Sequence, residues 1–319
     1  MARPQKTNVG VIGLGIIGQR AAVNLRKAGY QVWVWSRSPR PEPNFLPSPA
    51  EVAESAQVVQ IFVADGPALL ETVSAMAPAL TPAHTILNHA TVSPAETREA
   101  ARIVGDRHAK FLDAPFTGSR DAAAAGELVF FIGGDPAALA AVQPVLQANS
   151  KSVLVVGGVG DATAMKVATN LVAAVSVSAY AEAMALLAKA GVGPEKLPAA
   201  LESHAVRSPL ADMKVPGMIL ADFEPRFALK HMFKDMQIAL AMAAESGLEL
   251  PAAGAFAGEA MAGLQQGWAD RDFSCIADLF GYPNPEAALE DRFRPAAAPA
   301  PAESQATQKK WALFGGKGK

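Results

Sequence analysis

The sequence is poor in cysteine and in net charge, and both shortages exclude whole classes of protein. Cys275 is the one cysteine among 319 residues, so no disulfide can form within the chain and a reducing, cytoplasmic setting is expected. Lysine and arginine number 28 against 30 aspartates and glutamates, and the net charge of −2 gives no general attraction to nucleic acid or to an acidic membrane. The five histidines lack metal-ligand spacing, so no metal site is expected.

Uninterrupted apolar segments are also short. The first one, residues 9–12, runs directly into glycines, so no signal peptide is expected. The longest one begins at Asp161 but contains Lys166, Asn170 and Glu182, which favours a core helix over a membrane span. Half of the residues are hydrophobic and 18% are charged, so the main body is globular and long enough for two domains.

What the sequence does contain is a glycine triplet in a specific context. Residues 9–12 form a buried-strand pattern that leads into G-L-G-I-I-G and then into a helical stretch, the order typical of a dinucleotide-binding turn. Gly13 permits a tight turn, Gly15 lets the backbone approach a pyrophosphate, and Gly18 lets helix and strand pack closely. A plain glycine-rich turn is the alternative. The predicted cofactor contacts here are Gly13, Leu14, Gly15, Ile16, Ile17 and Gly18.

An acidic residue is missing after the second predicted strand, residues 31–35. NAD-dependent enzymes place a carboxylate there on the ribose 2′-hydroxyl. Here the sequence reads Ser36-Arg37-Ser38, and an arginine between two hydroxyls suits a 2′-phosphate. The pattern favours NADP(H) over NAD(H), with an ordinary solvated arginine as the alternative.

Further strand patterns alternate with helical ones up to residue 160. Helix starts with a capping-box pattern and proline at the first position follow Ser48 and Ser93. This alternation predicts a doubly wound, mainly parallel sheet, an N-terminal Rossmann-type domain over residues 1–160. The additional strands are expected at residues 58–63, 85–88, 110–113, 128–132 and 152–156.

The loops at the carboxyl edge of this sheet are candidate ligand contacts, because ligands bind at that edge. Val63 ends one predicted strand and Ala64 follows it, and Thr91 follows the next strand. A third loop reads D-A-P-F-T-G-S over residues 113–119, where a hydroxyl and a glycine can present backbone N–H groups to a carboxylate. An ordinary turn is the alternative for this third loop.

One long helix is predicted from Asp161, as N-cap, to Gly191, as the C′ stop. Lys166 and Asn170 are four residues apart and therefore share a face of it. A lysine on such an apolar helix is costly unless something compensates it. A lysine that snorkels to solvent at the first turn is the alternative.

The rest of the chain has helical patterns over residues 194–203, 229–244, 251–266 and 273–280 and no strand alternation. Residues 161–283 therefore form a predicted all-α domain, which the long helix joins to the first domain. Because that helix is apolar on most faces, it needs cover from a second copy, so a homodimer or homotetramer is expected. Lys230 and Lys234 are like charges at i,i+4 that an anionic cofactor would relieve, although two solvated lysines fit equally. Residues 284–319 are Ala/Pro-rich with a basic end, which predicts a disordered tail.

Taken together, these motifs resemble the β-hydroxyacid dehydrogenase family from about residue 8 to residue 280. Four of its motifs occur in order: the glycine fingerprint, D-A-P-F-T-G-S, a G-x₅-K-x₃-N run from Gly160 to Asn170, and Lys234-Asp235. Arg37, the G-S-R continuation at 118–120 and the F-A-L-K-H-M-F-K-D string make it most similar to the glyoxylate and succinic semialdehyde reductases.

The resemblance implies an activity and a role for each site residue. A hydride from NADPH would reduce a small aldehyde or 2-oxo acid, with Lys166 as proton donor and Asn170 as the orienting residue. The substrate, a small carboxylate, would contact Thr117, Gly118, Ser119, Phe227 and Asp235. Thr91 and Lys234 would contact the cofactor.

Four other functions fit part of the pattern. An NAD-dependent 3-hydroxyisobutyrate or tartronate semialdehyde dehydrogenase is disfavoured by Arg37. Relatives that reduce imines usually lack the lysine found here at 166, and 6-phosphogluconate dehydrogenases carry a histidine where Thr169 stands. The remaining alternative is an NADP-binding module without catalysis, against which Lys166 also speaks. The departures from the family pattern, such as Ala90 before Thr91, bear on the substrate rather than on the chemistry.

Overall fold

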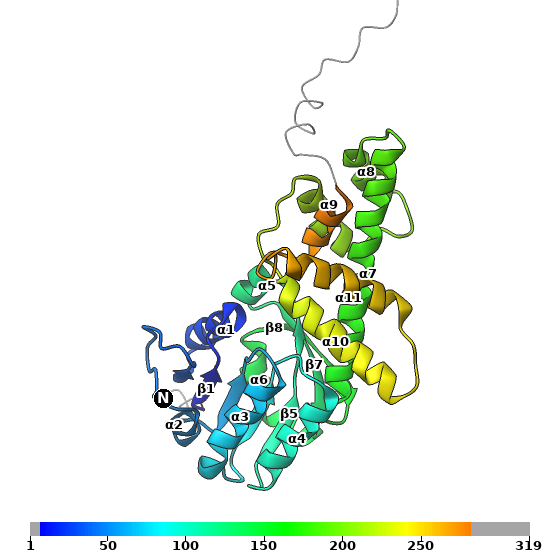
Figure 1. The fold of residues 1–319 in the computed structure, drawn as a ribbon. Helices are drawn as coiled ribbons and strands as arrows, with labels where there is room; N and C mark the ends of the chain where they lie inside the picture. Colours follow the sequence, from blue (N-terminus) through cyan, green and yellow to red (C-terminus); the bar gives the residue numbers. More distant parts are fainter. Residues whose placement is uncertain (1–6, 282–319) are drawn as a thin grey trace, which may run out of the picture. The chain divides into compact units, whose positions relative to one another are not determined.

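Eight strands form one sheet in the computed structural model, which describes residues 7–281 (Figure 1). The strand order is β2-β1-β3-β4-β5-β7-β6, with β8 on the other side of β7. The strands β1 to β5 are parallel, whereas β7 runs antiparallel to β5 and β6. The bounds are β1 Val9–Ile12, β2 Val32–Trp35, β3 Val58–Ile61, β4 Thr85–Asn88, β5 Lys110–Asp113, β6 Phe116–Thr117, β7 Leu128–Gly134 and β8 Ser150–Gly157.

Helices cover both faces of the sheet, so two apolar layers form. The consecutive residues Ile86 and Leu87 of β4 belong to different buried clusters, because successive side chains of a strand point to opposite faces. The helix α1 packs into the cluster of Leu87 through Leu25, and α3 packs into that of Ile86 through Leu69. The helices are α1 Ile16–Lys27, α2 Pro49–Ser55, α3 Gly66–Met76, α4 Pro94–Gly105, α5 Arg120–Ala125 and α6 Pro136–Gln147, with the short 3-10 turn η1 at Ala77–Ala79.

From residue 161 to residue 281 the structure is helical. A third buried cluster forms its core, to which α7, α10 and α11 contribute Val177, Met232 and Phe256. The elements are α7 Asp161–Lys189, η2 Pro194–Lys196, α8 Leu197–Glu202, α9 Pro209–Ile219, α10 Leu229–Glu245, α11 Pro251–Gln265 and η3 Phe273–Phe280. The predicted fold class, a Rossmann-type sheet followed by helices on a long helix, is confirmed. The division at residue 160 stays a prediction, and the predicted tail at 284–319 lies outside the described residues.

The long helix α7 is the described helix that by length and composition alone is apolar enough to cross a membrane. A core helix of a soluble protein passes the same test. In this fold α7 packs against β7, α10, α11 and η3.

The start of α7 corrects one prediction. Gly160 takes the N-cap position with a φ of +98°, and Asp161 is the first helical residue. The Asp161 carboxylate accepts a hydrogen bond from the Gly158 N–H at 2.8 Å, so it caps the preceding turn and not the helix. The predicted end is confirmed, because Gly191 follows the C-cap with a φ of +73°.

Three elements were not expected from the sequence. The helix α9 contains Pro216 in its interior, a residue that usually argues against a helix. The short α5 follows the Gly118-Ser119 turn, and β6 consists of Phe116 and Thr117 alone. The expected helix at 273–280 is a 3-10 helix, and the one at 194–203 divides into η2 and α8.

Candidate functional site

The ends of the parallel strands bring the predicted loops to one edge of the sheet. Ile12 at the end of β1 is level with Ile61 of β3, and Ile61 is level with Asn88 of β4. Asn88 is in turn level with Asp113 of β5. In the sheet, β2 lies on one side of β1 and β3 lies on the other, so the strand order reverses at β1. Sheets of this kind bind ligands in the crevice at such a reversal, and β1 borders it.

The three glycines of the turn after β1 are required for different reasons. At Gly13 the φ is +93° and a Cβ would overlap the Phe62 carbonyl oxygen, while at Gly18 a Cβ would overlap the Gly13 carbonyl oxygen. At Gly15 a Cβ would meet no protein atom within 4 Å. The protein itself therefore demands glycine at 13 and 18, and position 15 opens onto free space, as close approach by a ligand requires.

The N-terminus of α1 can accept an anion. Gly15 is its N-cap and supplies no side-chain hydrogen bond, so the N–H groups of the first turn have no side-chain partner there. Leu14 is buried, and Ile17 is half-buried, whereas 52% of Ile16 is exposed. The open space at Gly15 and the uncapped helix end together fit the pyrophosphate of a dinucleotide.

Among the residues that follow β2, Arg37 is a cation that no described residue binds. Arg37 is exposed and its side chain makes no hydrogen bond or ion pair with another described residue. The Ser36 hydroxyl donates to the Ser38 carbonyl at 2.6 Å. The acid that follows, Glu42, is already bound by Gln19 and by Arg26, at 2.8 and 2.9 Å. Of the other predicted cofactor contacts, Val63 and Thr91 are half-buried and Ala64 is exposed.

A chain of polar contacts connects α7 to α10 around Lys166. The Lys166 ammonium donates to Asn170 Oδ1 at 2.9 Å, and Asn170 Nδ2 donates to Asp235 Oδ2 at 2.6 Å. Because a carboxylate can only accept, Asp235 orients the amide of Asn170 with its oxygen toward Lys166. Asn170 and Asp235 are buried, and Lys166 is half-buried.

Lys234 extends this chain to the loop after β4. Its ammonium donates to the Thr91 carbonyl oxygen and lies 2.9 Å from Asp235 Oδ1. That second contact is an ion pair without hydrogen-bond geometry, because Asp235 Oδ1 accepts no hydrogen bond. The structure therefore brings together five predicted site residues from three separate segments: Thr91, Lys166, Asn170, Lys234 and Asp235.

The electrostatics of this cluster act on Lys166. Burial lowers the pKa of Lys166 from 10.5 to about 8, because the charged form loses contact with water. The carboxylate of Asp235 opposes this shift of the pKa, and the ammonium of Lys234 adds to it. Lys166 is therefore charged at neutral pH and releases its proton far more readily than an ordinary lysine.

The predicted substrate contacts Thr117, Gly118, Ser119 and Phe227 make no hydrogen bond with Lys166 or Asn170. Thr117, the last residue of β6, and Gly118, which follows it, are exposed, and Gly118 has a φ of +142°. Ser119 is the N-cap of α5 and accepts from the Ala122 N–H at 3.2 Å. The Phe227 ring stacks on His231, one turn before Lys234 on α10.

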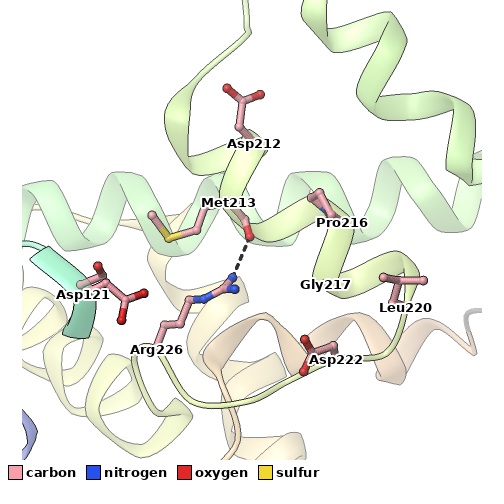
Figure 2. A pocket seen from close by; sticks show the side chains of 9 residues that line it. Asp121, Asp212, Met213, Pro216, Gly217, Leu220, Asp222 and Arg226 are labelled. Carbon is pink, nitrogen blue, oxygen red and sulfur yellow. Dashed lines mark hydrogen bonds between the residues drawn. The ribbon is translucent and has the colours of Figure 1, made fainter.

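A pocket of about 380 Å³ borders one of these residues without including Lys166 (Figure 2). Ser119 and Asp121, at the start of α5, line it together with Arg226, whose guanidinium donates to the Met213 carbonyl oxygen at 3.1 Å. This pocket contains none of the residues of the Lys166 cluster.

Two buried polar residues at the sheet edge were missed as functional candidates. Asp113 accepts three hydrogen bonds from the start of α7, although the sequence marks it only as the first letter of a turn motif. His89 follows β4 and stacks on Phe62, and burial lowers its pKa to about 4, so it is neutral. Their signal in the sequence is a polar residue directly after an apolar strand. Across residues 7–281 no group of three or more His, Cys, Asp and Glu side chains is arranged to hold a metal ion.

Two known protein families match consecutive stretches of the chain. Residues 8–158 match the family described as the NAD binding domain of 6-phosphogluconate dehydrogenase. Residues 160–280 match the family described as NAD-binding of NADP-dependent 3-hydroxyisobutyrate dehydrogenase.

Individual relatives cover most of the chain. The 2-hydroxy-3-oxopropionate reductase of Escherichia coli is 31% identical over 252 residues, which are 76% of this chain and 86% of the relative. The chloroplastic glyoxylate/succinic semialdehyde reductase 2 of Arabidopsis thaliana is 29% identical over 85% of this chain and 78% of its own length. The structure of Mycobacterium tuberculosis 3-hydroxyisobutyrate dehydrogenase with L-serine has a TM-score of 0.78 at 27% identity, covering 86% of this chain and 98% of that one.

A glycine turn at the crevice of a parallel sheet, followed by a long helix that carries a lysine, defines an oxidoreductase that uses a nicotinamide cofactor. With the 31% identical relative covered over 86% of its length, the chain belongs to the β-hydroxyacid dehydrogenase family. The resemblance inferred from the four sequence motifs is thereby confirmed.

Proposed function

We propose that the protein reduces a small aldehyde or 2-oxo acid, glyoxylate or succinic semialdehyde, to the hydroxy acid with NADPH. The observation that carries this proposal is the Lys166 ammonium, whose pKa is lowered to about 8 and which is held by Asn170. A carbonyl reduction needs a proton donor beside the oxygen that becomes negative, and this group meets that need.

The bound NADPH supplies the hydride, and the residues of the chain supply the proton and the geometry. Lys166 Nζ stabilises the negative charge that develops on the carbonyl oxygen and then donates its proton there. Asn170 holds the ammonium in place and adds no charge of its own. Asp235 keeps the Asn170 amide from flipping, because only Nδ2 can donate to it.

The substrate carboxylate is assigned to the turn after β6. Thr117 and Ser119 offer hydroxyls, and Gly118 offers an exposed backbone, at the N-terminus of a helix. Phe227 and the buried Asp235 complete the substrate site in this proposal. Thr91 and Lys234 contact the cofactor in this proposal.

The preference for NADPH rests on Ser36, Arg37 and Ser38. Arg37 is an exposed cation without a partner among the described residues, and no acid is free beside it. A guanidinium in that place suits a 2′-phosphate, which carries about two negative charges, better than a 2′-hydroxyl.

A second substrate class is supported by the comparisons. The 31% identical relative is a 2-hydroxy-3-oxopropionate reductase, and the similar solved structure is a 3-hydroxyisobutyrate dehydrogenase. Either activity would use the same lysine and the same cofactor edge, with a different fit at the turn after β6.

The test is the oxidation of NADPH and of NADH by the purified protein with glyoxylate, succinic semialdehyde or 2-hydroxy-3-oxopropionate, and the reverse reaction with 3-hydroxyisobutyrate. Lys166→Ala removes the proton donor, and Lys189→Ala, at the exposed end of the same helix, is the matched control. We expect turnover with NADPH in the wild type and the control, and loss of turnover in Lys166→Ala with retained cofactor binding. Tight NADPH binding without turnover on any of these acids favours the module without catalysis.

We also propose that a second copy of the chain covers α7, giving a homodimer or a homotetramer. An exposed apolar stripe on that helix supports this, with Val172 at 62% and Leu186 at 71% exposure. Light scattering on the wild type and on Val172→Glu tests it, and a monomeric wild type refutes it.

A further inference from the structure

The buried carboxylate of Asp113 lies at the junction between the sheet and α7. It ends β5, none of it is exposed, and it makes three hydrogen bonds. Its Oδ2 accepts from the Gly160 N–H at 3.0 Å and from the Thr163 N–H at 2.8 Å, and its Oδ1 accepts from the Thr163 hydroxyl at 2.7 Å. All three partners belong to the beginning of α7.

These bonds replace a cap that the helix does not supply for itself. Gly160, at the N-cap, has no side chain, and Asp161 is turned toward the Gly158 N–H. The first N–H groups of a helix need an acceptor, and its N-terminus favours a negative charge. Asp113 satisfies both requirements, although it lies 47 positions before Gly160 in the chain.

Capping a helix with a buried carboxylate costs free energy, because the charge loses its contact with water. Burial raises the pKa of Asp113, and the hydrogen bonds from Thr163 and Gly160 only oppose that shift. A serine or aspartate at the N-cap commonly caps a helix locally, but Gly160 has a φ of +98°, which such residues rarely adopt. Only a bond from the sheet, however, fixes the helix relative to the sheet.

The helix that Asp113 holds is the one that carries Lys166. Thr163, Lys166 and Asn170 follow one another at spacings of three and four residues, so they share one face of α7. Thr163 also lies 3.1 Å from the Thr97 hydroxyl of α4, the helix that begins just after the Thr91 loop. The first turn of α7 is therefore tied both to β5 and to the segment that carries a predicted cofactor contact.

From this geometry we infer that Asp113 is a positioning residue, which sets the height and rotation of α7 so that Lys166 Nζ meets the substrate oxygen at the carboxyl edge of the sheet. The inference rests on the proposed function and adds to it the element that aligns the proton donor. A misplacement of about 1 Å at a reacting group costs on the order of 100-fold in rate.

The variants separate positioning from folding. Asp113→Ala removes all three bonds and leaves two buried N–H groups without an acceptor. Asp113→Asn keeps an oxygen for both N–H groups and turns its amide toward the Thr163 hydroxyl, which can accept. Thr163→Val removes the hydroxyl bond to Asp113 and also the contact with the Thr97 hydroxyl, and it stays informative if Asp113→Ala does not fold. Asp135→Ala is the matched control, because Asp135 caps α6 through the Ala137 N–H and touches nothing in the site.

We expect Asp113→Ala to lower kcat about 100-fold with cofactor affinity nearly unchanged. Asp113→Asn restores kcat to within about fivefold of the wild type, Thr163→Val loses about five- to tenfold, and Asp135→Ala loses stability alone. The midpoint of the kcat–pH profile, near 8 in the wild type, moves upward in Asp113→Ala because a loosened Lys166 regains water. The charges that face Lys166, Asp235 and Lys234, are the same in every variant.

A measurement without turnover keeps this inference separate from the proposed function. The titration of Lys166, followed by NMR of ¹³C-labelled lysine and assigned with Lys166→Ala, reports its surroundings directly, and amide exchange at Thr163 reports the bond to Asp113. If amide exchange speeds up in Asp113→Ala while kcat and the lysine titration both stay as in the wild type, Asp113 is only structural and the inference is wrong. If the wild type reduces none of the acids and the titration still moves in Asp113→Ala, the proposed function fails and the positioning role stands.

Discussion

The glycine turn after β1 and the lysine cluster on α7 are assembled by opposite means. In the turn, the backbone conformation requires glycine at two positions. Gly13 has a positive φ, and a Cβ at Gly13 or Gly18 would overlap main-chain oxygens. In the cluster, side chains hold one another across the chain, with 65 positions between Asn170 and Asp235 and 143 between Thr91 and Lys234. A local motif thus specifies the first region, whereas the second exists only when distant elements meet.

The largest expected effect on stability tests how the turn is built. Gly13→Ala forces a side chain into a positive φ and against Phe62, so we expect a loss of about 3 kcal/mol in the free energy of unfolding. Gly15→Ala meets no protein atom, so we expect a loss below about 1 kcal/mol, yet at least tenfold weaker dinucleotide binding. Urea denaturation and cofactor titration measure both. Equal stability losses in the two variants would contradict the division of roles between these glycines.

The next effect tests whether the lysine cluster on α7 can be changed without affecting cofactor binding at the glycine turn. Lys166→Ala removes the proton donor and leaves the glycine turn intact, so we expect kcat to fall about 1,000-fold with the NADPH dissociation constant within about threefold of the wild type. Steady-state kinetics and fluorescence titration of the cofactor measure the two quantities. Loss of cofactor binding together with kcat would show that the two regions are not independent.

A smaller expected effect tests whether Arg37 contacts the 2′-phosphate of the cofactor. Arg37→Ala removes the exposed cation after β2. Because one charge-assisted hydrogen bond is lost, we expect NADPH to bind about tenfold more weakly and NADH to bind as before. Arg40→Ala, another exposed arginine of the same connection, is the control. A matching loss for NADH would exclude a contact to the 2′-phosphate.

The smallest effect tests the electrostatics of the cluster. Asp235 raises the pKa of Lys166 against the effect of burial, so Asp235→Asn lowers that pKa below about 8. Reduction needs protonated Lys166, and kcat therefore falls as the pH rises through this pKa. In Asp235→Asn we expect the fall to begin about one pH unit lower. A kcat–pH profile measures it, and an unchanged midpoint would mean that Lys166 is not the titrating donor.

Sequence reasoning found every described strand except β6, because each of the others is a short apolar run between turn residues. It misjudged the start of α7, since Asp161 stands where an N-cap is expected but bonds to Gly158 instead. It also passed over α9, where Pro216 lies inside a helix. Both errors come from contacts that override local preference.

The sequence alone determined the dinucleotide turn, the face shared by Lys166 and Asn170, and the family, because these depend on backbone conformation and on spacing along one helix. The tertiary structure decided which residues meet Lys166, what its pKa is and what holds its helix. The buried Asp113 shows why: the three groups that donate to it belong to Gly160 and Thr163, 47 and 50 residues further along the chain. Whether a carboxylate is exposed or caps a helix depends on the packing around it. Burial and charge are properties of surroundings, and only the folded chain supplies them.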